Sequence, residues 1–561
     1  MNLTLMPFNR LETSDDILFA TRGGTIHSFD LSNGKHVSSW QHPDVAKFAP
    51  AAQNEPNLTL KPDVQVETEA DAADLERPAK RAKIADEEAE STAAAAAAAA
   101  ADADGPLPKD QNGNKKGKKQ SKGSQNHGDR SRMGRTVDRP LVTLMACTQD
   151  GKHLVAVSGH DKAVWVFEHD GQGNLTELSQ RVMPKRPSAI AVGFEQDIIV
   201  ADKFGDVYSL PLFMTPLSPA TLALRAASAA ALKKQSSTRN EPAANTLTVH
   251  SKRNRIALEA QRKQLQAGGN SEPKSEVPSF DLSLLLGHVS MLTSLALAAR
   301  QPSSGQQGRK RRYILTADRD EHIRLSRYKP QAHIIEGFCL GHKEFVSEIL
   351  VPRHREDVLI SGGGDDYLFI WDWEAGKLLS KTNLVALSRE IAPQTSQVSV
   401  SCLTSLVYPS DEGPLTYILA TCEDLKAIFA WQLTEENELK NPSIIQLPCH
   451  PLHISAISPD KDDAPVKIIV AMDTSLSPEI RSLHSYTLTR SEGRLSSDME
   501  LPLHGQSPEE NEPRASPEEI RDMFYSVNKL RKQNGPGDDP EPDAAAKETG
   551  ELADEDVTNE M

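Results

Sequence analysis

The stretch Val358–Lys377, VLISGGGDDYLFIWDWEAGK, decides the fold. It contains a short apolar run, a turn of glycines and aspartates, and a second apolar run that closes on Trp371-Asp372. Each run has the length of an ordinary β-strand, and the turn residues between them favour an antiparallel hairpin. The stretch therefore predicts two paired strands whose apolar side chains enter a core.

Six other parts of the chain repeat this strand–turn–strand pattern. No helical periodicity separates the repeats, so the pattern excludes alternating strands and helices and indicates an all-β array of seven units. The six further repeats are ILFATRGGTIHSFDLSNGK (17–35), HLVAVSGHDKAVWVFEHDGQG (153–173), DIIVADKFGDVYSLPL (197–212), YILTADRDEHIRLSRY (313–328), YILATCEDLKAIFAWQL (417–433) and KIIVAMDTSLSPEIRSLHSYTL (467–488).

The repeats share residues that are typical of WD40 propellers. Two of them begin with Gly-His, at His288 and His342. An Asp precedes the closing position of the unit by six residues, at Asp320 and Asp365. In a blade of this kind a buried Asp orients the His and ties the strands together. We therefore expect two hydrogen-bonded pairs, His288–Asp320 and His342–Asp365.

The same spacing assigns two more residues to this network, which are Asp161, six residues before Phe167, and the closing Trp371. Other units have lost the Asp and carry Gly23, Phe204 or Leu425 in its place. The seven units predict an all-β fold, a seven-bladed WD40 β-propeller that closes on itself and leaves no long sheet edge bare.

Two long segments interrupt the repeats without period-2 alternation. Residues 44–138 include a nine-alanine run and the basic NKKGKKQSKG, and residues 215–279 are rich in Ala, Ser, Gln and Lys. Such segments bury too little apolar area to offset the backbone entropy lost on ordering, about 1–2 kcal/mol per residue. We expect both to be disordered insertions that leave the propeller as loops.

After the propeller, Ser516-Pro517-Glu518-Glu519 has the form of a capping box with Pro at the first helical position. Apolar residues follow at helical spacing until Gly535 ends the pattern. The expected divisions of the chain are the first blade (1–43), an insertion (44–138), blades two and three (139–214), an insertion (215–279), blades four to seven (280–490), an amphipathic helix (516–534) and an acidic disordered tail (535–561).

The composition narrows the class of protein. The net charge of −16 is concentrated at one end, because residues 504–561 hold 16 acidic against 6 basic residues. None of the five cysteines lies in a CxxC pair or near a histidine at ligand spacing, which argues against a disulfide framework or a zinc site. The N-terminus has no secretory pattern and no window approaches 18 consecutive apolar residues, so we expect no membrane contact.

Motifs for catalysis are absent from the sequence, which has no GxSxG, HExxH or glycine-rich cofactor loop between a strand and a helix. Gly362-Gly363-Gly364 lacks a following Lys-Ser/Thr and is interpreted as a turn of the repeat. The histidines His288 and His342 are assigned to the blade network. We expect no catalytic residue, no cofactor and no metal in this chain.

Basic clusters are the next candidates for function. PAKRAKI, residues 78–84, resembles a nuclear localisation signal through Lys80, Arg81 and Lys83, and we expect the protein in the nucleus. A charge run of this kind also serves as a solubiliser in many proteins. The basic runs 115–122 and 252–263 lack interleaved aromatics, so any RNA contact there would be non-specific phosphate binding.

Four stretches carry a resemblance to a known family. They are ADKFGDVYSL (201–210), LLLGHVSMLTSLAL (284–297), ILTADRDEHIRLSRY with IIEGFCLGHKEFVS (314–347) and LISGGGDDYLFIWDWEAGK (359–377). Together they closely resemble the WD-repeat, non-catalytic subunit of the eukaryotic tRNA (guanine-N7) methyltransferase in its fungal form. Close resemblance runs from about residue 197 to 377 outside the insertion, and weaker similarity reaches FYSVNKLRK (524–532).

The resemblance implies a heterodimer with a separate catalytic subunit, which would carry S-adenosylmethionine and methylate a guanine in the tRNA variable loop. Any tRNA contact of this chain would come through the complex. The partner is expected on the side of the blade that carries DRDEHIR. We expect Arg324 to be exposed there, on the strand face opposite Ile323 and Leu325. The residues that the resemblance implies for partner binding are Arg319, Glu321, His322, Arg324, Lys343, Glu344 and Phe345.

Two alternatives belong to other functional classes, a substrate receptor of a ubiquitin ligase and a general nuclear scaffold. Ubiquitin-ligase receptors of the WD40 type often carry a WDxR motif at blade ends. Here the corresponding residues are Trp371-Asp372-Trp373-Glu374, with Glu where Arg is required. This departure counts against the ubiquitin-ligase receptor. The identity of co-purifying proteins would distinguish a general scaffold from the other two functions.

Overall fold

The computed structural model describes residues 3–48, 139–214, 278–300, 310–411, 413–457, 465–503 and 512–532, with isolated positions between 217 and 259. The chain divides into two compact units, residues 1–49 with 136–561 and residues 50–135, and all described residues belong to the first. The expected disorder of the insertions and of the tail therefore falls almost wholly outside the described residues. The first insertion differs from expectation at its start, where α1 (Val45–Phe48) is helical.

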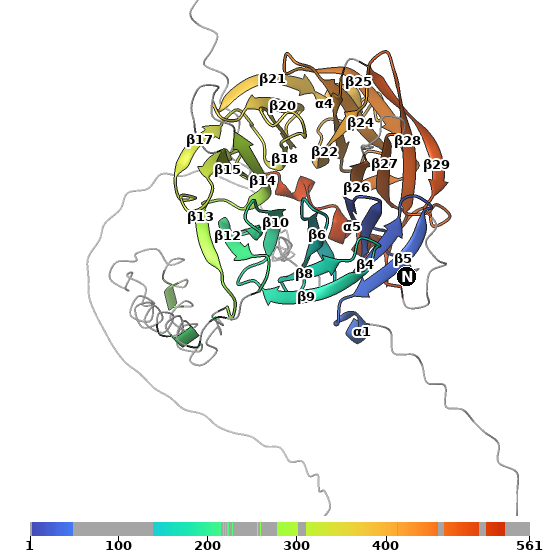
Figure 1. Cartoon of the computed structure of the whole chain (residues 1–561). Coiled ribbons are helices and arrows are strands. Elements are labelled where there is room, and N and C mark those ends of the chain that lie inside the picture. The colour runs from blue at the N-terminus through green and yellow to red at the C-terminus, as the bar shows by residue number, and fades with distance from the viewer. Residues whose placement is uncertain are drawn as a thin grey trace, which may run out of the picture. The chain divides into compact units, whose positions relative to one another are not determined.

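Seven four-stranded antiparallel sheets form a ring, and each sheet is one blade (Figure 1). This confirms the expected seven-bladed all-β propeller. The first four blades are β2 (Arg10–Ser14), β3 (Ile17–Arg22), β4 (Thr25–Asp30) and β5 (Lys35–Gln41); β6 (Val142–Cys147), β7 (His153–Ser158), β8 (Ala163–His169) and β9 (Leu175–Val182); β10 (Pro187–Val192), β11 (Asp197–Asp202), β12 (Asp206–Pro211) and β13 (Ser283–Gly287); and β14 (Leu292–Arg300), β15 (Arg311–Asp318), β16 (Ile323–Arg327) and β17 (Ile335–Cys339).

The last three blades have the same order of strands, each pairing with the next along the chain. The seventh blade ends beyond the expected residue 490, because its outer strand begins only at Arg494. These blades are β18 (Val346–Leu350), β19 (Leu359–Gly363), β20 (Tyr367–Asp372) and β21 (Lys377–Asn383), followed by α4 (Leu384–Ser388); β22 (Val400–Tyr408), β23 (Leu415–Cys422), β24 (Ala427–Leu433) and β25 (Leu439–Gln446); and β26 (His450–Ile457), β27 (Lys467–Asp473), β28 (Leu483–Ser491) and β29 (Arg494–Pro502).

The two middle strands of a blade are buried on both faces, because a neighbouring blade packs against each face. β11 is buried at every position and β19 likewise, whereas the outer strand β5 alternates between exposed and half-buried residues. The apolar clusters of the core accordingly lie between blades; one cluster, for example, joins Leu315 of the fourth blade to Trp371 of the fifth. Both faces of a middle strand must therefore be apolar or internally hydrogen-bonded.

The ring closes between the first and the seventh blade without exchange of a strand, since each of these blades consists of four consecutive strands. The backbone N–H of Phe8 donates to Ser482 Oγ at 2.9 Å across this junction. Outside the blades, β1 (Thr4–Leu5) pairs with β30 (Arg514–Ala515) and joins the two ends of the described chain.

Residues 512–532, here called the C-terminal strap, cross the centre of the ring of sheets in Figure 1. The strap contains α5 (Pro517–Phe524), which begins with the expected capping box at Ser516. Ile520 of α5 is fully buried in a cluster with Met6. Among the described residues, no helix is long and apolar enough to cross a membrane.

The helix ends at Phe524, well before the expected end at residue 534, and only the short 3₁₀ turn η1 (Asn528–Leu530) follows. Tertiary contacts explain the early end. Tyr525 donates its hydroxyl to Asp473 at 2.8 Å, and the N–H groups of Val527 and Asn528 bind the Glu423 carboxylate at 2.7 and 2.8 Å. These N–H groups bond a side chain of the sixth blade in place of helix carbonyls, so the regular helix does not continue.

Candidate partner-binding surface

The fifth blade contains a complete buried network. His342 Nδ1 lies 2.7 Å from Asp365 Oδ2, and His342 Nε2 lies 2.7 Å from the Ser361 hydroxyl. Trp371 Nε1 donates to the same hydroxyl at 2.8 Å. The Ser361 hydroxyl thus links the His342 imidazole to the Trp371 indole. The expected pair His342–Asp365 is confirmed, and Trp371 belongs to its network.

The fourth blade corrects the second expected pair. His288 Nδ1 lies 3.1 Å from Asp318 Oδ2, while its Nε2 lies 2.8 Å from the Thr316 hydroxyl. Asp318 also accepts the N–H groups of Asp320 and His322, at 2.9 and 3.1 Å. Burial by itself would raise the pKa of Asp318, but the hydrogen bonds from His288 and His322 outweigh it and hold the pKa below its usual value. The prediction of a His288–Asp320 pair was wrong.

The glycines of the fifth blade explain the difference. An added Cβ at Gly363 would lie 1.9 Å from the Phe345 carbonyl oxygen, so no side chain fits there and the turn brings Asp365 inward. In the fourth blade the position two before Asp320 is Asp318, whose carboxylate occupies the place beside the histidine. The six-residue spacing identifies the turn but not which of its carboxylates points inward.

Arg324 is only 7% exposed, contrary to the expected surface position. Its Nε donates to Ser326 Oγ at 3.0 Å and one terminal nitrogen donates to the Gly287 carbonyl at 2.9 Å. Burial lowers the pKa of its guanidinium. In the fifth blade, Phe369 and Trp371 occupy the register positions that Arg324 and Ser326 occupy in the fourth. Ser326 is much smaller than the tryptophan at the equivalent position, and the Arg324 side chain fills the space that this leaves. Both faces of this middle strand are buried, so Arg324 does not reach the surface.

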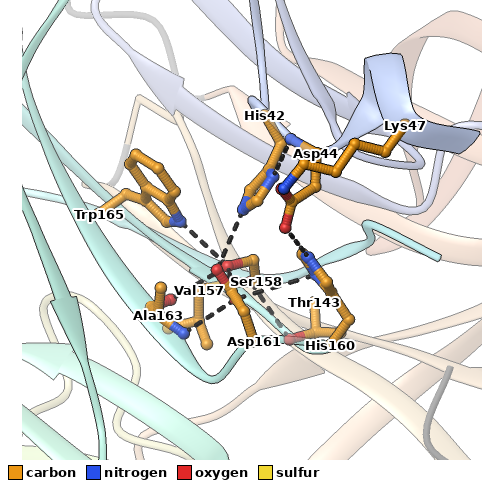
Figure 2. Close-up of polar contacts among 10 residues, drawn as sticks. All are labelled: His42, Asp44, Lys47, Thr143, Val157, Ser158, His160, Asp161, Ala163 and Trp165. Atoms are coloured by element: carbon orange, nitrogen blue, oxygen red, sulfur yellow. Dashed lines mark hydrogen bonds and ion pairs between the residues drawn. The ribbon is translucent and has the colours of Figure 1, made fainter. Parts of the chain in front are cut away.

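The second blade has a network of the same kind, shown in Figure 2. His42 Nε2 lies 3.2 Å from Asp161 Oδ2, Asp161 accepts the Ser158 hydroxyl, and Trp165 Nε1 donates to Ser158 Oγ at 3.0 Å. The assignment of Asp161 to a blade network is confirmed. Its histidine was missed, because Gln41 precedes it where a glycine is typical and the first insertion separates it from the rest of the blade.

The ligating atoms of His42, His160 and Asp161 lie within 4.8 Å of one another, a donor set that zinc accepts. The hydrogen bonds assign them another role. The Asp44 N–H donates to His42 Nδ1 at 3.1 Å, so the proton of this imidazole is on Nε2 and points to Asp161 (Figure 2). His160 Nε2 lies 3.1 Å from the Asp44 carboxylate. The cluster is a hydrogen-bonded junction between α1 and the second blade.

The C-terminal strap lies on the blade-four turn that carries the candidate partner residues. Arg319 Nε donates to the Leu530 carbonyl at 2.7 Å. Lys532 Nζ lies 2.7 Å from Glu321 Oε1 and 3.3 Å from Asp320 Oδ1. The hydrogen bond that Lys532 donates to Glu321 is the main cause of the raised pKa of Lys532. Arg319 and Glu321 are therefore engaged within the chain.

The same strap reaches the candidate residues of the fifth blade. Arg531 forms an ion pair with Glu344 at 3.1 Å and its guanidinium lies 5.5 Å from the centre of the Phe345 ring. A second nitrogen of Arg531 donates to the carbonyls of Gly364 and Val398, both at 3.0 Å. Phe345 itself is buried. Glu344 and Phe345 thus serve as an anchor for the strap.

His322 and Lys343 are the predicted partner residues with free side-chain surface. The His322 side chain is half exposed, its Nδ1 lies 3.7 Å from Asp318 and its ring lies 6.5 Å from the Phe338 ring. Lys343 is exposed, and within the described parts of the chain only its backbone N–H is engaged, by Asp365. Together they place an imidazole and an ammonium group on the surface of the fourth- and fifth-blade turns.

Exposed apolar side chains lie on the third and fourth blades near these turns. The sequence did not single them out, because each also fits a strand pattern. Val289 follows His288 and is completely exposed, and Phe204 is 66% exposed in the neighbouring turn. The two turns touch, since the His288 N–H donates to the Gly205 carbonyl at 2.7 Å. The other exposed members are Leu284 on β13 and Phe338 and Leu340 at the end of β17. We call the five apolar side chains the apolar rim.

A polar cavity of about 350 Å³ lies beside the strap, between the loop that follows α4 and the sixth blade. Gln394, Thr395, Glu423 and Asn528 are among the residues that line it. The lining residues include no histidine, lysine or cysteine.

The residues predicted for nuclear localisation, Lys80, Arg81 and Lys83, lie outside the described residues.

Comparisons with known proteins support one family. A family model described as the tRNA methyltransferase TRM82 WD40 domain matches residues 18–492. A relative in Sclerotinia sclerotiorum, named tRNA (guanine-N(7)-)-methyltransferase non-catalytic subunit trm82, is 37% identical over 85% of this chain and 87% of its own length. Relatives of the same name in Coccidioides immitis and Phaeosphaeria nodorum are 32% identical over 92% of this chain and 95% of their own, and 50% identical over 41% and 45%.

The family match and the fold agree, because the matched residues begin in the first blade and end in the seventh. The chain therefore belongs to the TRM82 WD40 family, the non-catalytic subunits of the fungal tRNA (guanine-N7)-methyltransferase.

Proposed function

We propose that this chain binds and stabilises the catalytic subunit of the tRNA (guanine-N7)-methyltransferase through the side of its fourth blade. The apolar rim carries this proposal. A completely exposed Val289 on the turn next to that of the exposed Phe204 is unusual for a surface that stays in water, and such side chains are typical of the centre of a protein interface. His322 and Lys343 supply the polar border that specific interfaces have.

The proposed division of labour follows from the family. The catalytic partner would hold S-adenosylmethionine and transfer its methyl group to a guanine in the tRNA variable loop, within a heterodimer. The relatives of this chain are named as the non-catalytic subunit. We propose that tRNA is reached through the complex and that the propeller provides a rigid platform for the partner.

The proposed location is the nucleus. It rests on the basic cluster of Lys80, Arg81 and Lys83. A fluorescent fusion in which these three residues are replaced by alanine is expected to lose nuclear accumulation relative to the parent. Unchanged nuclear signal would transfer import to another sequence or to the partner.

The ubiquitin-ligase alternative gains nothing from the described blade end. Glu374, which stands where that class requires Arg, forms an ion pair with Arg300 at 3.1 Å. Its role in the chain is thus a bridge between the fourth and fifth blades. A pull-down dominated by ubiquitin-ligase subunits would nevertheless displace the proposed function.

A single titration tests the proposed interface. Val289→Asp puts a charge on the apolar rim without touching the core, because the side chain is completely exposed. We expect the affinity for the catalytic subunit to fall about tenfold or more, equivalent to about 1.4 kcal/mol. Leu476→Asp is the matched control, since Leu476 is 80% exposed on the seventh blade.

Both variants should melt at the parent temperature. Methyl transfer to tRNA is expected with the partner, tRNA and S-adenosylmethionine together and not with this chain alone. Equal binding by Val289→Asp and the parent would show that the partner docks elsewhere, and methyl transfer by the isolated chain would contradict its non-catalytic role.

A further inference from the structure

The strap is held from one side of the ring to the other. Tyr525 binds Asp473 of the seventh blade, and Val527 binds Glu423 of the sixth. Arg531 then binds the Gly364 carbonyl of the fifth blade. The described strap ends at Lys532 on the turn of the fourth blade. Leu530 and Lys532 thus meet the blade that carries the proposed interface.

That turn has a conformation that needs support. Glu321 has a φ of +71°, in the left-handed region that residues other than glycine adopt under constraint from their surroundings. On the inside, the turn is held by Asp318, which accepts the N–H groups of Asp320 and His322. On the outside, the strap holds it through Lys532.

The strap also changes the charge of the rim. The turns of the fourth and fifth blades around the strap tip carry Asp320, Glu321, Glu344 and Asp366, and their cations are the half-buried Arg319 and the exposed Lys343. Lys532 pairs with Asp320 and Glu321, and Arg531 pairs with Glu344. The strap tip therefore adds two positive charges to this surface, which favours a partner surface with acidic groups.

We propose that the tip of the C-terminal strap braces the blade-four turn in the conformation that the partner binds, and that this partner presents acidic groups to the rim. The inference rests on the proposed function for the identity of the partner. The brace itself is a property of the free chain. Among the described residues, Lys532 is the last that contacts the turn.

Two truncated chains separate the strap tip from the acidic tail. A chain of residues 1–525 keeps α5 and its buried Ile520 but lacks the tip, whereas a chain of residues 1–532 lacks only the tail. In the free chain, amide exchange at residues 319–323 should become faster in 1–525 and stay unchanged in 1–532. Titration with the catalytic subunit should show at least about tenfold weaker binding for 1–525 and parent affinity for 1–532.

A charge exchange distinguishes bracing from direct contact of the tip with the partner. Lys532→Glu and Glu321→Lys should each weaken partner binding on the order of fivefold, because each places like charges together. The double variant restores an opposite pair and should recover most of the affinity. Lys152→Glu is the control, since Lys152 is exposed on the second blade and its Nζ lies 4.0 Å from Asp150.

Each outcome of these experiments either supports or overturns the proposed brace. Binding by 1–525 at parent affinity overturns the brace, and so does tighter binding, which would make the strap a competitor. Weak binding by 1–525 without rescue in the double variant also overturns it, in favour of direct contact. If the parent chain itself does not bind the catalytic subunit, the proposed function fails, while the exchange rates at residues 319–323 still report on the brace.

Discussion

At the scale of single residues, the propeller satisfies the same requirement with different side chains. Each blade network needs a carboxylate beside a histidine, and it is Asp365 in the fifth blade but Asp318 in the fourth. Where Ser326 replaces the tryptophan, Arg324 provides the missing volume and hydrogen bonds. A residue's role is thus set by which neighbour is small or absent, and not only by its place in the repeat.

The first residue-scale prediction compares the two aspartates of the fourth blade. Asp318→Ala removes the acceptor of a buried His288 and of two backbone N–H groups, so the free energy of unfolding should fall by about 1–3 kcal/mol. Asp320→Ala removes a pair with the half-exposed Lys532 and should cost less than about 1 kcal/mol. Urea denaturation of both variants checks this order; the reverse order would restore Asp320 to the network.

The second concerns Arg324. Arg324→Ala leaves Ser326 and the Gly287 carbonyl without their donor, so we expect a loss of about 1–3 kcal/mol in the free energy of unfolding. Lys343→Ala, at an exposed position, should stay within about 0.5 kcal/mol. Thermal melting of the free chain measures both. Parent-like melting of Arg324→Ala would mean that this guanidinium is available to the partner after all.

The sequence identified the turn at residues 318–322 and the candidates around it, but not which side chains are free. Period-2 alternation places Arg324 opposite Ile323, and in an ordinary half-exposed sheet that face meets water. A propeller blade has a neighbour on both faces, so the rule fails for its middle strands. The apolar rim was missed for the opposite reason, because Val289 and Phe338 have residue types that a core also uses.

At the scale of elements, the strap differs most from expectation. Its capping box and the start of α5 follow local rules and were predictable. Its end was not, because Asp473 and Glu423 belong to other blades and no local pattern announces them. The expected long helix to residue 534 was replaced by contacts that lie far away along the chain.

The element-scale prediction tests what holds the strap. Ile520→Ala removes a fully buried side chain from the cluster with Met6 and Leu141, a change that costs about 2–5 kcal/mol in cores. Limited trypsin digestion should then cut faster after Arg521 and Lys529, while the blades remain resistant. Glu518→Ala, on the exposed side of α5, is the control. Equal cleavage in both variants would place the strap's stability in its polar contacts.

At the scale of the whole molecule, the ring brings charged side chains from several blades together. Glu12 on β2 and Glu348 on β18 belong to the inner strands of the first and fifth blades. Burial raises the pKa of each carboxyl to about 7. The charge of Arg10, on the first blade, partly offsets this rise in the pKa of Glu348. Arg10 and Glu348 therefore interact across the centre of the ring.

These carboxyls predict a pH dependence. Because their folded pKa lies above the ordinary glutamate value of 4.5, their contribution to stability is complete below about pH 4.5 and is lost as the pH rises to about 7. Glu348→Gln should therefore be more stable than the parent at pH 8, by about 1–3 kcal/mol, with little advantage at pH 5. Urea titrations at both pH values check this, with Glu168→Gln on an exposed position as control. Equal gains at both pH values would contradict the titration.

The number of blades and the closed ring were predictable, because each blade is a local repeat and seven repeats can be counted along the chain. The route of the strap across four of those blades depends on contacts between distant residues, which a single sequence does not reveal.

The position of the strap after the last blade has a consequence for biosynthesis. Blades can fold one after another as they leave the ribosome, since each consists of consecutive strands. The brace forms only when Lys532 has emerged, after the last blade is complete. A chain cut short by a premature stop codon after residue 503 would still form the seven blades but would lack the braced rim. Under the proposed function, the catalytic subunit would then bind finished chains in preference to truncated ones at the moment of assembly.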